Sequence, residues 1–283
     1  MLLFKQVAPL RKHLTQVKKE CKKIGFVPTM GALHEGHLSL VRRSLKENCC
    51  TVCSIFVNPT QFNEASDLEH YPRTPEKDLG LLLGAGCQVL FMPYVEEVYP
   101  AKKTIGPDID FGYLVEPMEG AHRPGHFAGM AQVVHRLLEI VRPHRLYMGQ
   151  KDFQQFTIVQ HMLHQLHSSA KLVVCPIVRE PDGLAMSSRN ALLGPEERAL
   201  APRIYQTLLD TRKKMHALFP RQLEEEALRQ LSVPGIVPEY FNIVDGKTLR
   251  PVQLFEDTHY AVACTAVKIG NVRLLDNMIL KDH

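Results

Sequence analysis

Two histidines, His34 and His37, are the first side chains along the sequence whose type and spacing could do chemistry. They flank Gly36, after a short apolar run and a loop and at the start of an amphipathic segment, which predicts a strand, a loop and a helix. A helix N-terminus offers free N–H groups and the positive end of a dipole to an anion. The pattern therefore indicates a loop that handles phosphate. The alternative is that the histidines cap the helix or bind a metal.

Three more loops carry polar groups suited to a small anionic substrate. Residues 58–62 hold amides that donate and accept hydrogen bonds, although an Asn-Pro turn with a solvent-facing Gln61 would give the same residues. Lys151 lies at a strand end, where it could neutralise a phosphate while Asp152 caps the next helix; a solvated lysine beside a capping aspartate is the alternative. Residues 186–190 bring two hydroxyls and a guanidinium that could wrap a triphosphate.

The elements that must position these loops alternate over residues 1–176. Strands are predicted at 24–27, 51–57, 88–92, 145–148 and 172–178, and helices at 36–48, 75–83, 130–141 and 153–167. This alternation predicts an α/β fold with a doubly wound, Rossmann-like parallel sheet and right-handed crossovers. In such a sheet, ligands bind beyond the carboxyl ends of the strands.

The pattern changes after residue 176. Two helices, at about 194–218 and 223–231, and two strands, at 240–244 and 260–267, are predicted there. We therefore predict a smaller α+β domain over residues 177–283. Residues 100–110 are predicted to form the most mobile loop.

Composition excludes several classes of function. The chain has 283 residues, and 34 basic against 30 acidic side chains give a net charge of only +4. The basic residues are scattered, so we expect no nucleic-acid partner and no membrane-surface partner. No apolar run approaches the ~18 residues of a membrane span, and we predict a cytoplasmic protein.

The cysteines and a histidine-rich helix are the other candidates for metal chemistry. The seven cysteines do not resemble a secreted disulfide framework, and we predict that they are reduced thiols. Cys50 and Cys53 have metal-ligand spacing, but no second pair completes a site, and we expect them to pack inside a strand. His161, His164 and His167 lack a carboxylate partner and predict a surface or dimer-contact face rather than a metal site.

Taken together and in order, these loops resemble the pantothenate synthetase (pantoate–β-alanine ligase) family. The resemblance extends to residues 54–62, 71–74, 123–127 and 273–277. Residues 34–37 resemble the HIGH box of the wider nucleotidylyltransferase superfamily, and residues 186–189 lie where its KMSKS loop lies, with Arg189 in place of a lysine. The resemblance implies ATP-dependent condensation of (R)-pantoate with β-alanine to pantothenate, AMP and diphosphate through an enzyme-held pantoyl adenylate.

The resemblance also implies the site. His37, His34 and Lys151 would be catalytic. ATP would contact Met30, His34, His37, Gly149, Gln150, Lys151, Asp152, Val178, Met186, Ser187, Ser188 and Arg189. Pantoate and β-alanine would contact Pro28, Met30, Asn58, Gln61, Tyr71, Arg123, His126 and Gln155. Mg²⁺ would arrive on the ATP phosphates, with no protein metal site and no tightly bound cofactor.

Three further expectations follow from this assignment. Many relatives have glutamate where this chain has Gln150, which puts a role for position 150 in doubt. Because an acyl adenylate hydrolyses readily, the domain at 177–283 is expected to act as a lid that carries residues 186–190 over the nucleotide. The family also implies a homodimer whose partners are otherwise the small-molecule substrates.

Other activities fit parts of the pattern. A nucleotidylyltransferase acting on a phosphate-containing acceptor would need more basic residues than the loops at 58–62 and 153–155 supply. The histidine content could instead mark a metal-dependent hydrolase, which a metal analysis would distinguish. A non-catalytic RNA-binding relative is disfavoured by the modest charge and the absence of tryptophan.

Overall fold

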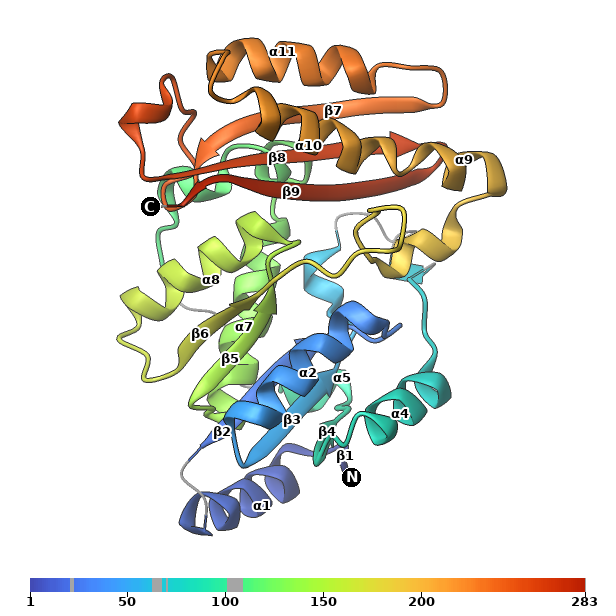
Figure 1. Ribbon diagram of the computed structural model, residues 1–283. Coiled ribbons are helices and arrows are strands. Elements are labelled where there is room, and N and C mark those ends of the chain that lie inside the picture. Colours follow the sequence, from blue (N-terminus) through green and yellow to red (C-terminus); the bar gives the residue numbers. More distant parts are fainter. Residues whose placement is uncertain (21–22, 63–67, 70, 101–108, 283) are drawn as a thin grey trace. The chain divides into compact units, whose positions relative to one another are not determined.

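The computed structural model describes residues 1–20, 23–62, 68–69, 71–100 and 109–282 (Figure 1). The chain divides into two compact units. The first comprises Met1–Phe111, Gly120–Gly149 and Ile158–Cys175. The second comprises Gly112–Glu119, Gln150–Thr157 and Pro176–His283. Most of the loop predicted to be mobile, residues 101–108, lies outside the described residues.

The first unit is built on a six-stranded parallel sheet. In spatial order its strands are β1 (Leu2–Phe4), β4 (Val89–Phe91), β3 (Cys50–Ile55), β2 (Ile24–Thr29), β5 (Arg145–Gly149) and β6 (Lys171–Cys175). Every neighbouring pair described in this sheet is parallel. Strands β2, β3 and β4 are almost wholly buried, as parallel strands covered on both faces must be.

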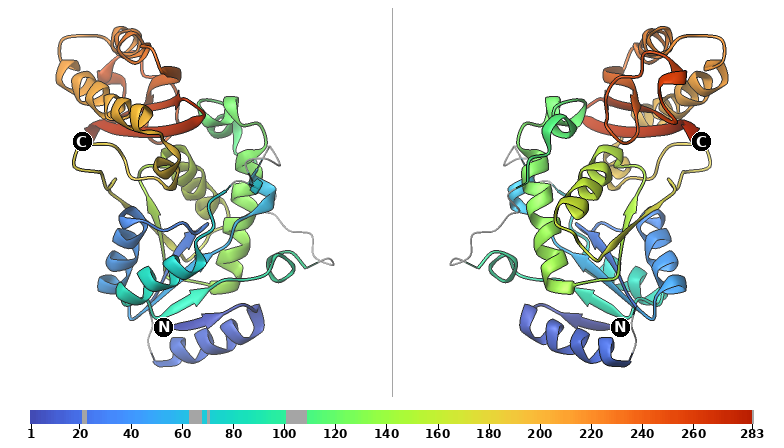
Figure 2. Two further views of the ribbon diagram at one scale, coloured as in Figure 1. Left: turned by 90° about the vertical axis from the view of Figure 1, so that its right-hand side faces the viewer. Right: turned by 90° about the vertical axis from the view of Figure 1, so that its left-hand side faces the viewer.

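Helices cover both faces of this sheet. The helices described between Met1 and Cys175 are α1 (Val7–Glu20), α2 (Glu35–Glu47), α4 (Pro75–Gly84), α5 (Val95–Val98), α6 (Glu119–His122), α7 (His126–Val141) and α8 (Phe153–Gln165), of which α6 and α8 straddle the two units. α2 and α7 lie on opposite faces of the sheet (Figures 1 and 2). Leu38 and Val41 of α2 pack with Val27 and Cys53 of the strands beneath them.

The second unit holds a three-stranded antiparallel sheet in the order β7 (Ile236–Asp245), β8 (Tyr260–Ile269), β9 (Val272–Asp282). Its helices are α9 (Pro195–Leu200), α10 (Arg203–Lys214) and α11 (Pro220–Leu231). Buried residues of α10 and α11, including Leu208 and Leu223, share one core with Phe241 and Val267 of the sheet. The predicted fold class, a helix-flanked parallel sheet followed by a smaller α+β part, is confirmed.

Two of the elements were predicted too long, and proline explains where each of them ends. The single helix expected over 194–218 is broken, because α9 ends at Leu200 and α10 begins at Arg203. Pro202 lies at the break; it has no N–H, and inside a helix its ring would clash with the carbonyl four residues earlier. The strand expected over 172–178 ends at Cys175, since Pro176 cannot donate to the sheet.

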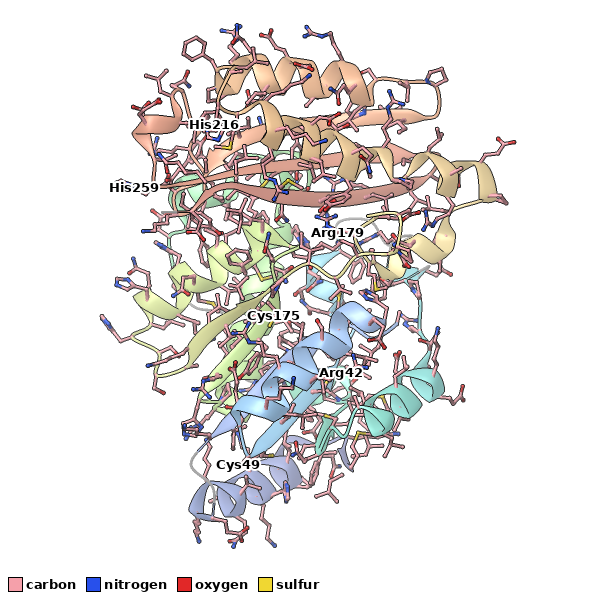
Figure 3. All side chains as sticks on the ribbon, in the orientation of Figure 1. Arg42, Cys49, Cys175, Arg179, His216 and His259 are labelled. Atoms are coloured by element: carbon pink, nitrogen blue, oxygen red, sulfur yellow. The ribbon has the colours of Figure 1, made fainter. Side chains whose placement is uncertain are left out.

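The cysteine prediction is correct for five residues and wrong for one. Cys50, Cys53, Cys87, Cys175 and Cys264 are free and buried, which confirms that Cys50 and Cys53 pack within β3. Burial raises the pKa of each of these thiols. Cys49, labelled in Figure 3, is exposed and disulfide-bonded, so the prediction of a reduced thiol is wrong for this residue.

The histidine-rich helix lies at the surface, as predicted. His164 and His167 are exposed, and the ring of His161 packs at 6.0 Å from that of Phe111. In the described part of the chain, no helix is both long and apolar enough to cross a membrane.

Candidate active site

The loop between β2 and α2 places both histidines at the helix N-terminus. His34 is the N-cap, and its Nδ1 accepts the N–H of Gly36 at 3.1 Å. His37 Nδ1 accepts the N–H of His34 at 3.4 Å, and the two ring centroids lie 4.1 Å apart. The alternative interpretation, that these histidines cap the helix, is therefore correct for the Nδ1 atoms of both rings. Because Nδ1 accepts in both rings, each neutral ring carries its proton on Nε2, as a donor to an anion requires.

A buried carboxylate that the sequence analysis missed holds this loop. Asp78, in α4, is 1% exposed. Its Oδ2 accepts the N–H of Ala32 at 2.9 Å, and its Oδ1 accepts the N–H of Leu33 at 2.7 Å. Gly31 and Ala32 have φ of 86° and 49°, a left-handed pair that turns successive N–H groups toward one acceptor. The signal in the sequence was an aspartate four residues before Leu82, on the buried face of a helix.

The amides at 58–61 form a buried, oriented cluster. Tyr99 Oη donates to Asn58 Oδ1 at 2.8 Å. Asn58 Nδ2 donates to the carbonyl of Gly129 at 3.1 Å and to Gln61 Oε1 at 3.3 Å. This chain of donors leaves the Gln61 amide nitrogen facing Met30, whose sulfur it contacts at 2.9 Å. Gln61 is only 8% exposed, so the alternative of a solvent-facing glutamine is wrong.

His126, Arg123 and Tyr71 surround the same 58–62 segment. The carbonyl of Gln61 can only accept, so His126 Nδ1 donates to it, at 2.9 Å. Arg123 Nη1 lies 3.3 Å from His126 Nε2, which therefore accepts. Tyr71 is buried and its ring meets that of Phe62 edge-on at 5.7 Å. Pro28 lies near the end of β2, and its register partner on β3 is Ser54.

The second unit carries the other predicted ATP contacts. After Gly149 ends β5, Lys151 Nζ lies 3.5 Å from Asp152 Oδ1, and the Asp152 carbonyl accepts the N–H of Phe156 at the start of α8. Lys151 is neither buried nor fully solvated, since its side chain is 20% exposed. Gln155 is half-buried on α8.

The segment from Val178 to Met186 folds back on itself. The N–H of Met186 donates to the carbonyl of Val178 at 2.9 Å, with a left-handed Gly183 at the turn. Ser187 Oγ then accepts the N–H of Arg189 at 3.2 Å and so caps the short helix Ser188–Leu192. The structure thus brings together Val178, Met186, Ser187 and Arg189 in the second unit.

Comparison with known proteins identifies the family. The family model for pantoate-beta-alanine ligase matches residues 2–279. The chain belongs to the pantoate–β-alanine ligase family. Pantothenate synthetases of Porphyromonas gingivalis and Bacteroides fragilis are each 48% identical to it, over 100% of both chains.

Solved structures of the pantoate–β-alanine ligase family agree. The pantothenate synthetase of Thermus thermophilus has a TM-score of 0.92 and 42% identity, covering 99% of this chain and 100% of that one. The ligase of Francisella tularensis, complexed with beta-gamma ATP and beta-alanine, has a TM-score of 0.82 and 33% identity, covering 99% of this chain and 98% of that one. The predicted resemblance is confirmed; the roles of individual residues stay predictions.

Proposed function

We propose that this ligase condenses (R)-pantoate with β-alanine in two steps, through a pantoyl adenylate. The observation that carries the proposal is the match to pantoate–β-alanine ligases over the whole chain. A relative complexed with beta-gamma ATP and beta-alanine supports the choice of substrates. The geometry of the histidine loop adds two ring N–H donors at a helix N-terminus, a place suited to a phosphate.

In the first step, a carboxylate oxygen of pantoate attacks the α-phosphorus of ATP. The bond from that phosphorus to the bridging oxygen breaks, and diphosphate leaves. The reaction needs no protein nucleophile; it needs two anions aligned and the charge on the phosphate oxygens neutralised. We assign neutralisation to His34, His37 and Lys151, with the hydroxyls of residues 187 and 188 and the Arg189 guanidinium contacting the β- and γ-phosphates.

Mg²⁺ enters this scheme as part of the ATP substrate. Among the residues that the structure describes, no three His, Cys, Asp or Glu side chains gather as metal ligands. We propose that the ion is held by phosphate oxygens and water, ligands that Mg²⁺ prefers. Its charge would assist the departure of diphosphate.

In the second step, the amine of β-alanine attacks the acyl carbon of the adenylate. The bond between that carbon and the phosphate oxygen breaks, AMP leaves with the electron pair, and the amine loses a proton. We assign pantoate recognition to Gln61 because Asn58 and Tyr99 fix its amide with the nitrogen on the side of Met30, where it can donate to a hydroxyl or carboxylate oxygen. Tyr71, Arg123, His126 and Gln155 are assigned to the same pocket by resemblance.

The adenylate must be kept from water between the two steps. We therefore retain the proposals that residues 177–283 close over the nucleotide and that the enzyme is a homodimer. Crystals grown with and without ATP test the first, since an unchanged arrangement of residues 186–190 would contradict it. Light scattering tests the second, because a monomer at working concentration would refute it.

The deciding experiment follows the products directly. Purified protein is incubated with ATP and ¹⁸O-carboxyl-labelled D-pantoate, with and without β-alanine. We expect diphosphate in both reactions and one labelled oxygen in AMP once β-alanine is added. Unlabelled AMP would eliminate the adenylate. Lys151→Ala should lower the rate of diphosphate release by about 10²–10³-fold, and a loss below about tenfold in a folded variant would remove Lys151 from contact with the phosphates.

A further inference from the structure

Residues 178–186 of the second unit form a tight hairpin. Arg179 and Ala185 face each other across it in an antiparallel bridge. At its turn, Gly183 has a φ of 95°, and a Cβ there would lie 2.1 Å from the ring of Tyr205. Glycine is therefore required at this turn, both for the left-handed backbone and for the close approach of the ring.

The side chain of Arg179, labelled in Figure 3, fixes this hairpin to β9. Asp276, which is 3% exposed, accepts Nη1 at 2.6 Å and Nη2 at 2.9 Å. Nη1 also donates to the carbonyl of Gly183 at 2.9 Å, and the guanidinium carbon lies 4.0 Å from the centre of the Tyr205 ring. One planar group thus joins a strand, the hairpin turn and a side chain of α10. A lysine ammonium reproduces neither the paired hydrogen bonds nor the stacking.

The hairpin leads directly into residues 187–189, to which we have assigned the β- and γ-phosphates of ATP. Leu184 of the hairpin is buried in the core of the second unit. Asn190 Nδ2 donates back to the carbonyl of Ala185 at 3.1 Å. The conformation of residues 187–190 therefore depends on the hairpin, whose polar anchor is Arg179.

From this geometry we infer that Arg179 is a positioning residue, which keeps residues 187–189 in the conformation that binds the β- and γ-phosphates. The inference rests on the proposed function. The guanidinium is engaged by Asp276 and the Gly183 carbonyl, so Arg179 acts through the hairpin and not on the phosphates. Because ATP would bind only the anchored conformation, its apparent Kd rises in inverse proportion to the anchored fraction, whereas saturating ATP restores the anchored state.

Arg179→Lys tests the inference, because it keeps the charge and removes the planar fork. An anchored fraction of about a tenth would raise the KM for ATP about tenfold in the pantoate-dependent exchange of diphosphate into ATP. We expect such a rise, with kcat at saturating ATP and the KM for pantoate unchanged. In titration calorimetry, the Kd should rise by the same factor for ATP and stay near the wild-type value for AMP, which lacks the β- and γ-phosphates.

The loosened segment should also be visible without substrate. In amide hydrogen exchange followed by mass spectrometry, peptides that cover residues 186–192 should exchange faster in Arg179→Lys than in wild type. Peptides from the parallel sheet of the first unit should exchange at the wild-type rate in both proteins. This assay therefore separates a released hairpin from a general loss of stability.

Arg198→Lys is the matched control. Arg198 also pairs with a carboxylate of this hairpin, that of Asp182 at 2.5 Å, but the two side chains are 36% and 38% exposed. Because exposed ion pairs contribute little, this variant should follow wild type in every assay. If Arg179→Lys does not fold, Arg179→Met combined with Asp276→Asn replaces it, since this pair of changes leaves no unpaired charge buried.

The outcomes are distinct. Faster hydrogen exchange at residues 186–192 with an unchanged KM for ATP would overturn the inference, and so would wild-type behaviour in both assays. A fall in kcat at saturating ATP, or an equal rise in the Kd for ATP and for AMP, would overturn it as well. If wild type itself shows no pantoate-dependent exchange of diphosphate, the proposed function fails. The titrations and the hydrogen exchange do not depend on that reaction, so the two failures are distinguishable.

Discussion

Replacing Asp78 by asparagine tests whether one buried carboxylate keeps the histidine loop in its active shape. The two oxygens of Asp78 accept the N–H groups of Ala32 and Leu33 at 2.9 and 2.7 Å. Asparagine has the same size but a single acceptor oxygen. Whichever way its amide turns, one of the two backbone N–H groups must face an NH₂ group.

The magnitude follows from the bond that is lost. A hydrogen bond to a charged group contributes about 1.5–3 kcal/mol, and a buried donor without a partner costs about 1–3 kcal/mol. The two ranges describe the same N–H group and are therefore not added. We expect the free energy of unfolding to fall by about 2–3 kcal/mol. The left-handed Ala32, at φ 49°, is then free to relax, and a shift of about 1 Å at His34 and His37 would lower kcat by ~10²-fold.

Two assays separate these effects. The chain has no tryptophan, so urea unfolding is followed by far-UV circular dichroism, and diphosphate exchange reports the chemistry. Glu76→Gln is the matched control, because it removes the same charge from the first turn of α4 at an exposed side chain. Glu76→Gln should change neither the free energy of unfolding nor kcat. An Asp78→Asn enzyme with wild-type unfolding and wild-type kcat would refute the reasoning.

Three other predictions concern pantoate binding, stability and pH. Gln61→Ala should raise the KM for pantoate by about 5–150-fold and leave the KM for ATP unchanged, since a buried substrate group loses its partner. If steady-state kinetics show a raised KM for ATP and an unchanged KM for pantoate, Gln61 lies outside the pantoate pocket. Arg273→Met should cost about 3–5 kcal/mol in urea unfolding, because it removes the guanidinium that contacts the buried carboxylate of Glu119 at 2.6 Å and the partly buried carboxylate of Glu239 at 2.7 Å; a loss no larger than for an exposed ion pair would contradict this. Burial raises the pKa of Tyr147 to about 12, so the stability that the protonated hydroxyl confers is complete below about pH 10 and is lost as the pH rises toward 12. Tyr147→Phe should therefore flatten the curve of unfolding free energy against pH between these values. An unchanged curve would contradict this prediction.

The parallel sheet could be predicted because its signals are local. Each strand of the first unit is a short apolar run followed by a loop or proline, and the helices between them show one apolar face. β9 could not be predicted in this way. Its apolar run is interrupted by Asp276 and Asn277, which are both buried and both polar. Asp276 and Asn277 break the hydrophobic pattern of β9. In the folded chain Asp276 binds Arg179, and Asn277 donates to the carbonyl of Gln150.

Within the candidate site, the sequence predicts the side chains that would contact substrate but not the groups that orient them. His34, Gln61 and Lys151 stand out because their side-chain chemistry follows predicted strands. The groups that orient them do not stand out, because they lie far away in the sequence. Asp78 is 46 residues from Ala32, Tyr99 is 41 from Asn58, and Asn277 is 127 from Gln150. No local pattern reveals such a pairing; only the folded chain does.

These distant partners suit the chemistry that we propose. A reaction without a protein nucleophile depends on alignment, so its rate is set by how firmly the contacting loops are held. Each loop is held by a polar group that is distant in the sequence, namely buried Asp78 for residues 32–33, partly buried Tyr99 through buried Asn58 for Gln61, and buried Asn277 for residues 150–151. Away from water, such groups bind their partners strongly and are costly to leave unpaired. Substitutions at these three positions should therefore lower kcat although none of them removes a group that touches substrate.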